Sequence, residues 1–250
     1  MANLKGQKVA AKLRKGGYDG KGVELVNKAD IEQGQIPFDG PVVLEEFVEN
    51  AIELSVIVAR NEAGDVKTFP TVEMAFDPKA NLVDILFAPA NISQAIDTQA
   101  KSIAQSCIEH LNGVGIFAVE MFLNQSGEVL VNEIAPRPHN SGHHTIEACY
   151  TSQYEQLNRI LLGMPLGDTQ LIQASAMMNI LGFENVSGPY EMTGLEHILN
   201  LPGVFVHLYN KAETKPMRKM GHITIMGQDL HEVMQKLQTV KQHLGMKAAS

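Results

Sequence analysis

Two glutamates on a predicted β-hairpin have the side-chain type and spacing of metal ligands. Residues 116–123 and 128–135 are rich in β-branched and other apolar side chains, and an Asn-Gln-Ser-Gly turn separates them. A four-residue loop places Glu120 opposite Val131. Glu133 is then the diagonal neighbour of Glu120 on the same inward face, at roughly 7–8 Å between Cα atoms. Buried carboxylates are costly unless they are paired, so we expect a divalent metal between them.

The segment after the hairpin is polar and basic. Residues 132–143 read Asn-Glu-Ile-Ala-Pro-Arg-Pro-His-Asn-Ser-Gly-His, so an arginine, histidines and an asparagine come directly after the carboxylates. One interpretation of His143 and His144 is a fragment of a zinc site, although further ligands with suitable spacing are missing from the sequence. A hydrogen-bonded structural histidine is the simpler interpretation of His144.

A second candidate site lies near the N-terminus. Residues 9–13 are apolar apart from Lys12 and predict a strand, and residues 14–22 combine glycines with basic side chains. Glycine allows the backbone to approach a ligand closely, and the cations favour an anion such as a polyphosphate. A solvated hairpin loop has the same composition, so the loop alone leaves both interpretations open.

The composition is that of a globular protein with a sizeable core. Of the 250 residues, 44% are hydrophobic and 19% are charged, and the formal net charge of −8 disfavours nucleic acid or anionic membranes as partners. No apolar run approaches the roughly 18 residues that a membrane helix needs, and the N-terminus lacks an apolar signal core. Cys107 and Cys149 have no spacing partners and are interpreted as core thiols in a reducing compartment. These features together predict a cytoplasmic location.

The remaining pattern predicts the elements that position these residues. Alternating or continuous apolar runs predict strands over 42–48, 52–60, 66–75, 174–181, 204–209 and 222–226. Helical spacing predicts helices over 93–111, 145–162 and 229–244. Ser93 is the expected N-cap of the first of these helices. The pattern changes near Gln173, after which a small α+β module is expected.

The order of these features resembles the ATP-grasp superfamily, in which two lobes hold ATP between them. A lysine on a strand precedes a glycine-rich basic loop, Glu53 follows Glu45 by eight residues, and two carboxylates lie on a later hairpin. The loop at 16–22 and the segment at 132–143 resemble the phosphate loop and active-site signature of the N5-carboxyaminoimidazole ribonucleotide synthase family. The resemblance extends from about residue 9 to the C-terminus and covers the second and third domains of that family.

The resemblance implies an α+β fold with three parts. These are an ATP-grasp small lobe over 1–50, an ATP-grasp large lobe over 51–172 and a C-terminal module over 173–250. It further implies that Lys12 contacts the phosphates of ATP, with Gly17, Tyr18, Asp19 and Gly20 in the loop that closes over them. The alternative for Lys12 is an ordinary surface lysine.

The rest of the implied nucleotide and metal site lies on the later strands. Glu45 and Val48 would present backbone groups to the adenine edge, and Glu53 would accept hydrogen bonds from the ribose hydroxyls. A solvated strand end is the alternative for Glu45. Glu120 and Glu133 would hold Mg2+, or Mn2+, together with the ATP phosphates. A pair of exposed or lysine-paired glutamates is the alternative. Many ATP-grasp enzymes have an asparagine two residues after the second metal glutamate, where this chain has alanine.

The acceptor side follows from the same resemblance. Arg137 would stabilise carboxyphosphate, and His139 and Asn140 would line the place where bicarbonate and the aminoimidazole meet. Lys211 and Arg218 would bind the 5′-phosphate of the ribonucleotide. A solvated basic run is the alternative for these last two residues, because their loop is rich in lysine and glutamate.

The implied reaction is the ATP-dependent carboxylation of 5-aminoimidazole ribonucleotide by bicarbonate, through carboxyphosphate, which is a step of purine biosynthesis. The products are N5-carboxyaminoimidazole ribonucleotide, ADP and phosphate. Another ATP-grasp ligase and a non-catalytic Mg-ATP-binding fragment are the alternatives. The enzymes that this chain resembles are usually homodimers and begin with an additional α/β domain. We therefore expect the 250-residue chain alone to bind nucleotide weakly and to turn over little.

Overall fold

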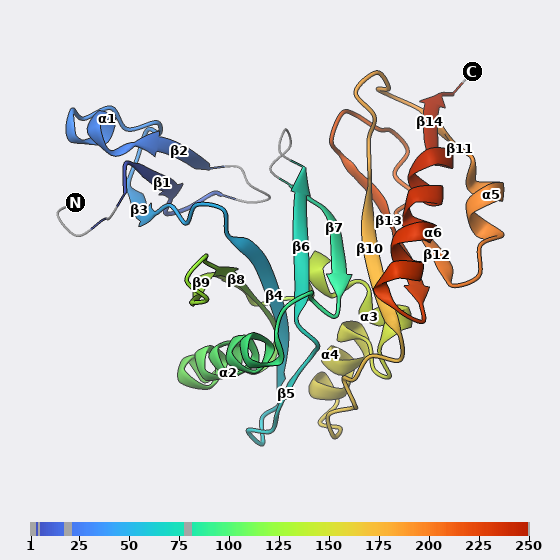
Figure 1. Ribbon diagram of the computed structural model, residues 1–250, viewed down its shortest axis with the longest axis horizontal. Coiled ribbons are helices and arrows are strands. Elements are labelled where there is room, and N and C mark those ends of the chain that lie inside the picture. The colour runs from blue at the N-terminus through green and yellow to red at the C-terminus, as the bar shows by residue number, and fades with distance from the viewer. Residues whose placement is uncertain (1–3, 5, 18–21, 78–81, 250) are drawn as a thin grey trace. The chain divides into compact units, whose positions relative to one another are not determined.

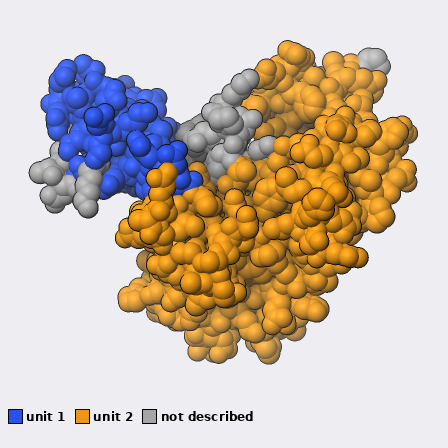
Figure 2. All heavy atoms as spheres, in the orientation of Figure 1, with its two compact units in different colours: residues 1–51, 77–82 blue, residues 52–76, 83–250 orange. Residues whose placement is uncertain are grey.

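The computed structural model describes residues 4, 6–17, 22–77 and 82–249. The chain divides into two compact units, which Figure 2 distinguishes by colour. Unit 1 consists of residues 1–51 and 77–82, and unit 2 consists of residues 52–76 and 83–250. The division into small lobe, large lobe and C-terminal module stays a prediction.

Unit 1 is a small antiparallel sheet with the order β2-β1-β3 and one short helix, α1 (Lys28–Glu32) (Figure 1). The strands are β1 (Lys8–Leu13), β2 (Val23–Asn27) and β3 (Val42–Glu46). The central strand β1 carries the apolar residues Val9, Ala10 and Ala11, which are buried. The strand predicted over 9–13 is confirmed as β1, and the strand predicted over 42–48 is confirmed as β3, which ends at Glu46.

The frame of unit 2 is a nine-stranded sheet. Eight of its strands follow the order β12-β13-β10-β7-β6-β4-β8-β9, and the short strand β5 pairs with β4 beside this path. The bounds are β4 (Ile52–Arg60), β5 (Val66–Thr68), β6 (Val72–Asp77), β7 (Leu82–Ala88), β8 (Gly115–Leu123), β9 (Val129–Ala135), β10 (Ala174–Leu181), β12 (Val204–Leu208) and β13 (Lys219–Gly227). The carboxylate hairpin β8–β9 therefore forms one end of the sheet, and the C-terminal strands form the other.

The two faces of strands β4 and β8 are covered by different helices. Helix α2 (Gln94–Leu111) packs Ala100, Ala104 and Ile108 against one face, which carries Val56 and Val119. Its predicted N-cap is confirmed, since the Ser93 side chain accepts a hydrogen bond from the backbone N–H of Ile96 at 3.3 Å.

The opposite face carries Ile57, Ala59 and Ala118, and helix α4 (Gln153–Leu161) covers it with Ile160. Since side chains alternate along a strand, Glu53, Ser55 and Glu120 also lie on this second face. The sequence alternation therefore decides that the candidate site and α2 are on opposite sides of the sheet.

The C-terminal part of the sheet has its own core. Helices α5 (Leu195–Leu199) and α6 (Leu230–His243) contribute Ile198, Val233 and Leu237 to an apolar cluster with Ile180 and Ile223 of the strands. A two-stranded sheet of β11 (Tyr190–Thr193) and β14 (Gly245–Ala248) completes this region. The strands over 174–181 and 204–209 and the helix over 229–244 were thus predicted correctly in type and nearly in extent, whereas the strand predicted over 222–226 extends over residues 219–227 as β13.

The helix predicted over 145–162 is wrong, because the chain is extended in its middle. Helix α3 (Thr145–Ala148) ends where Cys149 adopts φ −120° and ψ 155° and forms a bridge with Leu171. Helix α4 then begins after Ser152, whose side chain accepts a hydrogen bond from the backbone N–H of Glu155 at 3.1 Å. The N-cap at Ser152 was the sequence signal for this second start. The strand predicted over 66–75 is likewise divided, into β5 and β6.

Within the described part of the chain, no helix is both long enough and apolar enough to cross a membrane. Neither of the two cysteines forms a disulfide. Cys149 is buried, and burial raises the pKa of its thiol to about 12, which agrees with a core thiol rather than a nucleophile.

Candidate functional site

The carboxylate hairpin pairs in a register different from the predicted one. Leu123 pairs with Val129, and a β-bulge at Asn132 then brings Glu133 directly opposite Glu120. The turn causes the first shift, since the Asn124 side chain accepts hydrogen bonds from the backbone N–H groups of Ser126 and Glu128, at 3.0 and 2.9 Å. The predicted diagonal arrangement is therefore wrong, and the two glutamates face each other across the strands.

The two glutamates differ in burial. Glu120 is 9% exposed, whereas Glu133 is exposed, so the expectation that both point into an apolar interior is wrong for Glu133. Desolvation, together with the negative charges of Glu133 and Glu53, raises the pKa of Glu120 to about 7. In the absence of a cation, this pair of facing carboxylates has an electrostatic cost that a divalent metal would remove.

Glu53 belongs to the same group of carboxylates. It pairs with Phe122 across β4 and β8, so it is a diagonal neighbour of Glu120 on the second face of the sheet. Burial raises the pKa of Glu53 to about 7. The structure thus places three of the predicted site residues, Glu53, Glu120 and Glu133, together.

A short polar network holds His139 beside Glu120. The Nε2 atom of His139 lies 3.5 Å from Oε1 of Glu120, and its Nδ1 atom lies 2.9 Å from Oγ of Ser141. The Ser141 hydroxyl is itself 2.8 Å from the hydroxyl of Ser55 on β4. Both serines are fully buried, so the orientation of the imidazole is set by the packed sheet rather than by solvent. The two serines were not singled out from the sequence.

Arg137 and Asn140 lie on either side of His139 in the sequence. Arg137 is exposed, and its positive charge lowers the pKa of Glu120. Asn140 begins the short 3-10 helix η1 (Asn140–Gly142) and forms two reciprocal amide hydrogen bonds with Asn179 of β10, at 2.8 and 3.0 Å. Asn179 is a further residue that the sequence alone did not indicate.

His143 and His144 do not form a zinc site. His144 is fully buried, and its Nδ1 atom is 3.1 Å from the carbonyl oxygen of Ser141, as expected for a structural histidine. His143 instead stacks on His222, with ring centroids 4.6 Å apart. Among the described residues, no group of three or more His, Cys, Asp or Glu side chains is arranged to hold a metal ion.

The C-terminal basic loop connects β12 to β13. Lys211 donates to the carbonyl oxygen of Lys219, and Arg218 donates to that of Glu213 at 2.7 Å, so both predicted phosphate ligands also hold the loop in shape. Lys219 is the functional candidate that sequence reasoning missed. Its charge lowers the pKa of both Glu120 and His143, which places it electrostatically within the site, and its position next to Arg218 was the available signal.

The predicted residues of unit 1 form a separate group. Lys12 on β1 forms an ion pair with Glu45 of β3, with Nζ 2.6 Å from Oε2. The two side chains lie on the same face, since Lys12 pairs with Val43 and Ala10 with Glu45. Val48 follows the end of β3 and is half-buried. Gly17 is exposed, and Tyr18, Asp19 and Gly20 lie outside the described residues.

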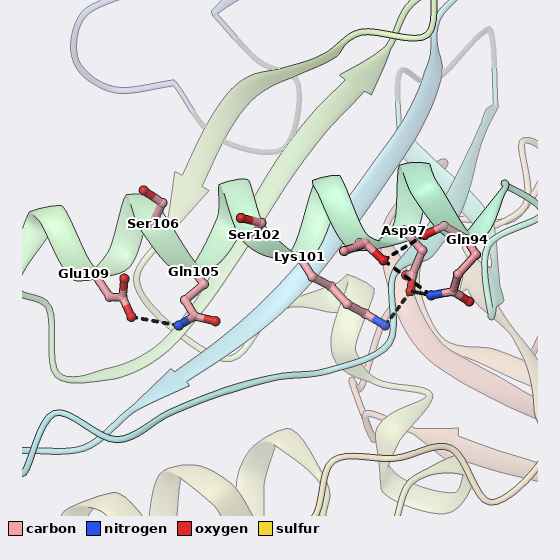
Figure 3. Close-up of a pocket in the computed structure, with 8 residues that line it drawn as sticks. Gln94, Asp97, Lys101, Ser102, Gln105, Ser106 and Glu109 are labelled. Atoms are coloured by element: carbon pink, nitrogen blue, oxygen red, sulfur yellow. Dashed lines mark hydrogen bonds and ion pairs between the residues drawn. The ribbon is translucent and has the colours of Figure 1, made fainter.

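A hollow along helix α2 is not part of this site. Its lining side chains all come from the exposed face of that helix, as Figure 3 shows. Lys101 pairs there with Asp97 at 2.8 Å, and Gln105 donates to Glu109 at 2.8 Å. Because α2 covers the sheet face opposite Glu120, this hollow and the carboxylates are separated by the sheet.

The carboxylate pair fits magnesium better than a softer metal. Mg2+ is usually bound by one or two carboxylates, with the remaining positions taken by phosphate oxygens and water. Glu120 and Glu133 provide two hard oxygen donors side by side on neighbouring strands. The histidines nearby are engaged in hydrogen bonds and ring stacking, so they are not free as additional nitrogen ligands.

The fold and the paired carboxylates agree with the comparison with known families. Residues 1–154 match the family described as the ATP-grasp domain, and this chain belongs to that family. Residues 175–236 match the family described as the phosphoribosylaminoimidazole carboxylase C-terminal domain. The expected α+β ATP-grasp fold with a C-terminal module is confirmed.

The relatives within the family are N5-carboxyaminoimidazole ribonucleotide synthases and phosphoribosylaminoimidazole carboxylases. The synthase of Bacillus subtilis is 42% identical over 228 residues, which are 90% of this chain and 58% of that protein. The crystal structure of the synthetase from Thermotoga maritima superposes with a TM-score of 0.87 at 45% identity, covering 98% of this chain and 64% of that one.

A third relative was solved with ligands. The synthase from Aspergillus clavatus, in complex with ADP and 5-aminoimidazole ribonucleotide, superposes with a TM-score of 0.80 at 32% identity, over 94% of this chain and 61% of that one. The chain thus spans about three fifths of the length of the relatives that it matches.

Proposed function

We propose that this chain carries the catalytic carboxylates of an ATP-dependent carboxylation of 5-aminoimidazole ribonucleotide. Bicarbonate is the carboxyl donor, and the products are N5-carboxyaminoimidazole ribonucleotide, ADP and phosphate. The observation that carries the proposal is the direct pairing of Glu120 with Glu133 beside Arg137 and His139. The relatives, one of which was solved with ADP and the ribonucleotide, support the same chemistry.

In unit 2 the proposed roles follow from the side chains. Glu120 and Glu133 would hold Mg2+, which would neutralise charge on the ATP phosphates while the terminal phosphoryl group passes to bicarbonate. Glu53 would accept hydrogen bonds from the ribose hydroxyls, because an ionised carboxylate is purely an acceptor. Arg137 would bind the carboxyphosphate anion through its planar guanidinium group.

The acceptor would meet the carboxyl group at the segment after the hairpin. His139, held by Ser141, and Asn140, held by Asn179, would orient bicarbonate and the aminoimidazole ring. Lys211 and Arg218 would bind the 5′-phosphate of the ribonucleotide, and Lys219 would add positive charge near the reacting anions. Fixed cations of this kind stabilise developing negative charge without reorganising during the reaction.

In unit 1, Lys12 and the loop that includes Gly17 would contact the nucleotide phosphates, and the backbone at Glu45 and Val48 would contact the adenine edge. The Lys12–Glu45 ion pair supports the first role indirectly, because it shows that the ammonium group reaches an anionic partner on this face of the sheet. A homodimeric assembly stays a prediction, and so does a cytoplasmic location.

An ADP-release assay tests the proposal. ADP formation by the protein that carries this chain is measured with and without bicarbonate and with and without the ribonucleotide, in wild type, Glu133→Gln and Glu128→Gln. Glu128 lies exposed at the turn of the same hairpin and bonds to Asn124, so its variant is the matched control. We expect ADP release to need both substrates, to be lost in Glu133→Gln and to be retained in Glu128→Gln.

The assay also separates the alternatives. Another ATP-grasp ligase would release ADP with a different acceptor, and a non-catalytic protein would bind Mg-ATP without substrate-dependent ADP release. Unchanged turnover in Glu133→Gln would overturn the metal assignment.

A further inference from the structure

Three polar residues form a row across the C-terminal strands. Asn179 of β10 lies directly opposite His222 of β13, and His222 lies directly opposite His207 of β12. Residues paired in this way point to the same face of an antiparallel sheet. The other face of these strands carries Ile180, Ile223 and the apolar cluster beneath α6, so the row is on the side turned away from that helix.

Each member of the row contacts one residue of the segment that follows the carboxylate hairpin. Asn179 exchanges two amide hydrogen bonds with Asn140, at 2.8 and 3.0 Å. His222 stacks on His143 with a centroid distance of 4.6 Å and an interplanar angle of 26°. His207 Nε2 lies 2.7 Å from Oε1 of Glu147.

The spacing of these contacts matches the backbone of the segment. Its three contacting residues are three and four positions apart. Asn140 begins η1, His143 follows η1 with helical backbone angles (φ −66°, ψ −34°), and Glu147 lies on α3, so successive turns of the chain present them to the same side. The strands present their partners at the spacing of neighbouring strands, roughly 5 Å. The helical segment therefore lies across the three strands, and each of its three contacting residues meets the row residue of one strand.

The rings of the row extend into a column. His207 stacks on His222 with centroids 4.5 Å apart, and His222 stacks in turn on His143. Burial lowers the pKa of His222 to about 3 and that of His143 to about 4, so both rings are neutral at neutral pH and stack without charge repulsion. The Tyr209 hydroxyl lies 3.0 Å from Nδ1 of His222 and fixes the ring from the side.

The row carries a cost that a purely packing role would avoid. Within the described residues, Nε2 of His222 and Oε2 of Glu147 are buried without a hydrogen-bond partner. Apolar side chains of similar size would fill the same space without unpaired polar atoms. Met177, two residues before Asn179 on the same face of β10, is such a side chain and is fully buried. The polar contacts therefore fix one particular position of the 139–147 segment on these strands, which apolar packing alone would not specify.

That placement connects two groups of proposed site residues. Asn140 and its neighbour His139 come from the segment after the hairpin, whereas Lys219 begins the same strand, β13, that carries His222. We propose that Asn179, His222 and His207 are positioning residues that hold the 139–147 segment in register with the basic loop at 211–219. This rests on the proposed function in one respect, namely that both groups bind the acceptor ribonucleotide.

Binding and amide exchange, measured on the same variants of the protein that carries this chain, test the proposal. Asn179→Leu removes both amide hydrogen bonds, and Asn179→Asp keeps the size of the side chain but removes its donor to Asn140. Thr224→Val is the matched control, because Thr224 is fully buried on the same face of β13 and its hydroxyl has no hydrogen-bond partner among the residues that the structure describes. Dissociation constants for 5-aminoimidazole ribonucleotide and for ATP are measured separately by calorimetry.

We expect Asn179→Leu to raise the dissociation constant for the ribonucleotide about tenfold and that for ATP less than about twofold. Asn179→Asp should have an intermediate effect, and Thr224→Val should leave both constants near wild type. Hydrogen–deuterium exchange should become faster at residues 139–147 in both Asn179 variants, and melting temperatures show whether each variant is folded.

The outcomes are distinct for the two proposals. If the wild-type protein binds no ribonucleotide, the proposed function fails, and the exchange rates at 139–147 still decide the positioning role. Unchanged exchange and unchanged ribonucleotide affinity in both Asn179 variants would overturn the positioning role. Equal losses of affinity for ATP and for the ribonucleotide, if they also occur in Thr224→Val, would show that the row contributes only ordinary packing. That result would overturn the positioning role as well.

Discussion

The carboxylate hairpin of unit 2 and the small sheet of unit 1 both carry residues proposed to bind ATP, but under different physical conditions. Glu120 is 9% exposed and lies beside a network of fully buried serines. Lys12 and Glu45 have side chains that are 20% and 39% exposed, and strand β3, which carries Glu45, has no buried residue. The first site is held in place by its surroundings before any ligand binds, whereas the second depends on a partly solvated ion pair.

The difference decides what each group can contribute. The burial of Glu120 makes its negative charge opposite Glu133 costly, so a cation bound there removes a large penalty. A partly exposed ion pair is stabilised by less than about 1 kcal/mol, so an ammonium group in such a pair can exchange one anionic partner for another at little cost. We therefore expect substitutions in unit 2 to affect the reaction strongly and substitutions in unit 1 to affect mainly nucleotide affinity.

The largest effect is expected at Glu120. Replacing Glu120 with glutamine removes one of the two proposed metal ligands, and we expect kcat/KM to fall by about 100-fold or more, since metal-ion stabilisation is worth several kcal/mol. Magnesium titrations of the ADP-release rate should show a higher Mg2+ requirement in this variant. A rate within a few-fold of wild type at the same Mg2+ concentration would contradict the difference between the two units.

A smaller effect is expected at Lys12. Lys12→Met keeps the length of the side chain but removes its charge, and we expect the KM for ATP to rise about tenfold with kcat nearly unchanged. Lys8→Met is the matched control, because Lys8 is exposed on the same face of the same strand, four residues before Lys12. The two variants are compared in steady-state kinetics at varied ATP. Equal effects of both would show that Lys12 acts through surface charge in general.

The outcome of sequence reasoning also differed between the two regions. The strands of the hairpin were predicted correctly from apolar patterning, because a strand with one buried face alternates regularly. The pairing register was not, because it depends on the side-chain hydrogen bonds of Asn124 and on a bulge at Asn132, and neither has a periodic signature.

The residues that hold the site in place were missed for a related reason. Ser55, Ser141 and Asn179 act through contacts between segments far apart in the sequence, and a single serine or asparagine carries no local sign of its partner. Lys219 could have been found, because it directly follows Arg218 at the end of the basic loop that precedes a predicted strand. The short helices α3 and α4 were merged because their combined apolar spacing remained helical across the extended residues between them.

A pH effect on stability is expected from the histidine column of unit 2. The pKa of His222 is lowered to about 3, below its ordinary value near 6.5, so between these values the unfolded chain binds a proton that the folded chain does not. Its contribution to stability is therefore present above pH 6.5 and is lost as the pH falls toward 3. Urea denaturation of wild type and His222→Phe at pH 7 and pH 5 measures this contribution.

We expect the free energy of unfolding of His222→Phe to fall less on acidification than that of wild type. The slope of this free energy against pH should differ between the two by the equivalent of up to about one proton. The control Thr224→Val alters the same face of β13 without removing a titrating group, so its slope should follow wild type. Parallel pH dependences for wild type and His222→Phe would show that this ring is not the source of the loss.

The smallest effect is expected for Glu45→Gln in unit 1. The proposed contact of Glu45 with adenine uses the backbone, which glutamine leaves intact, so the KM for ATP should change less than about twofold. Loss of the Lys12–Glu45 ion pair, whose Nζ to Oε2 distance is 2.6 Å, should lower the free energy of unfolding of unit 1 by less than about 1 kcal/mol, because both side chains are partly solvated. Thermal denaturation and ATP kinetics of the same preparation give both values. A large rise in the KM for ATP would mean that the Glu45 carboxylate itself takes part in nucleotide binding. Side chains of unit 1 would then contribute to the site more strongly, as those of unit 2 do, than their exposure indicates.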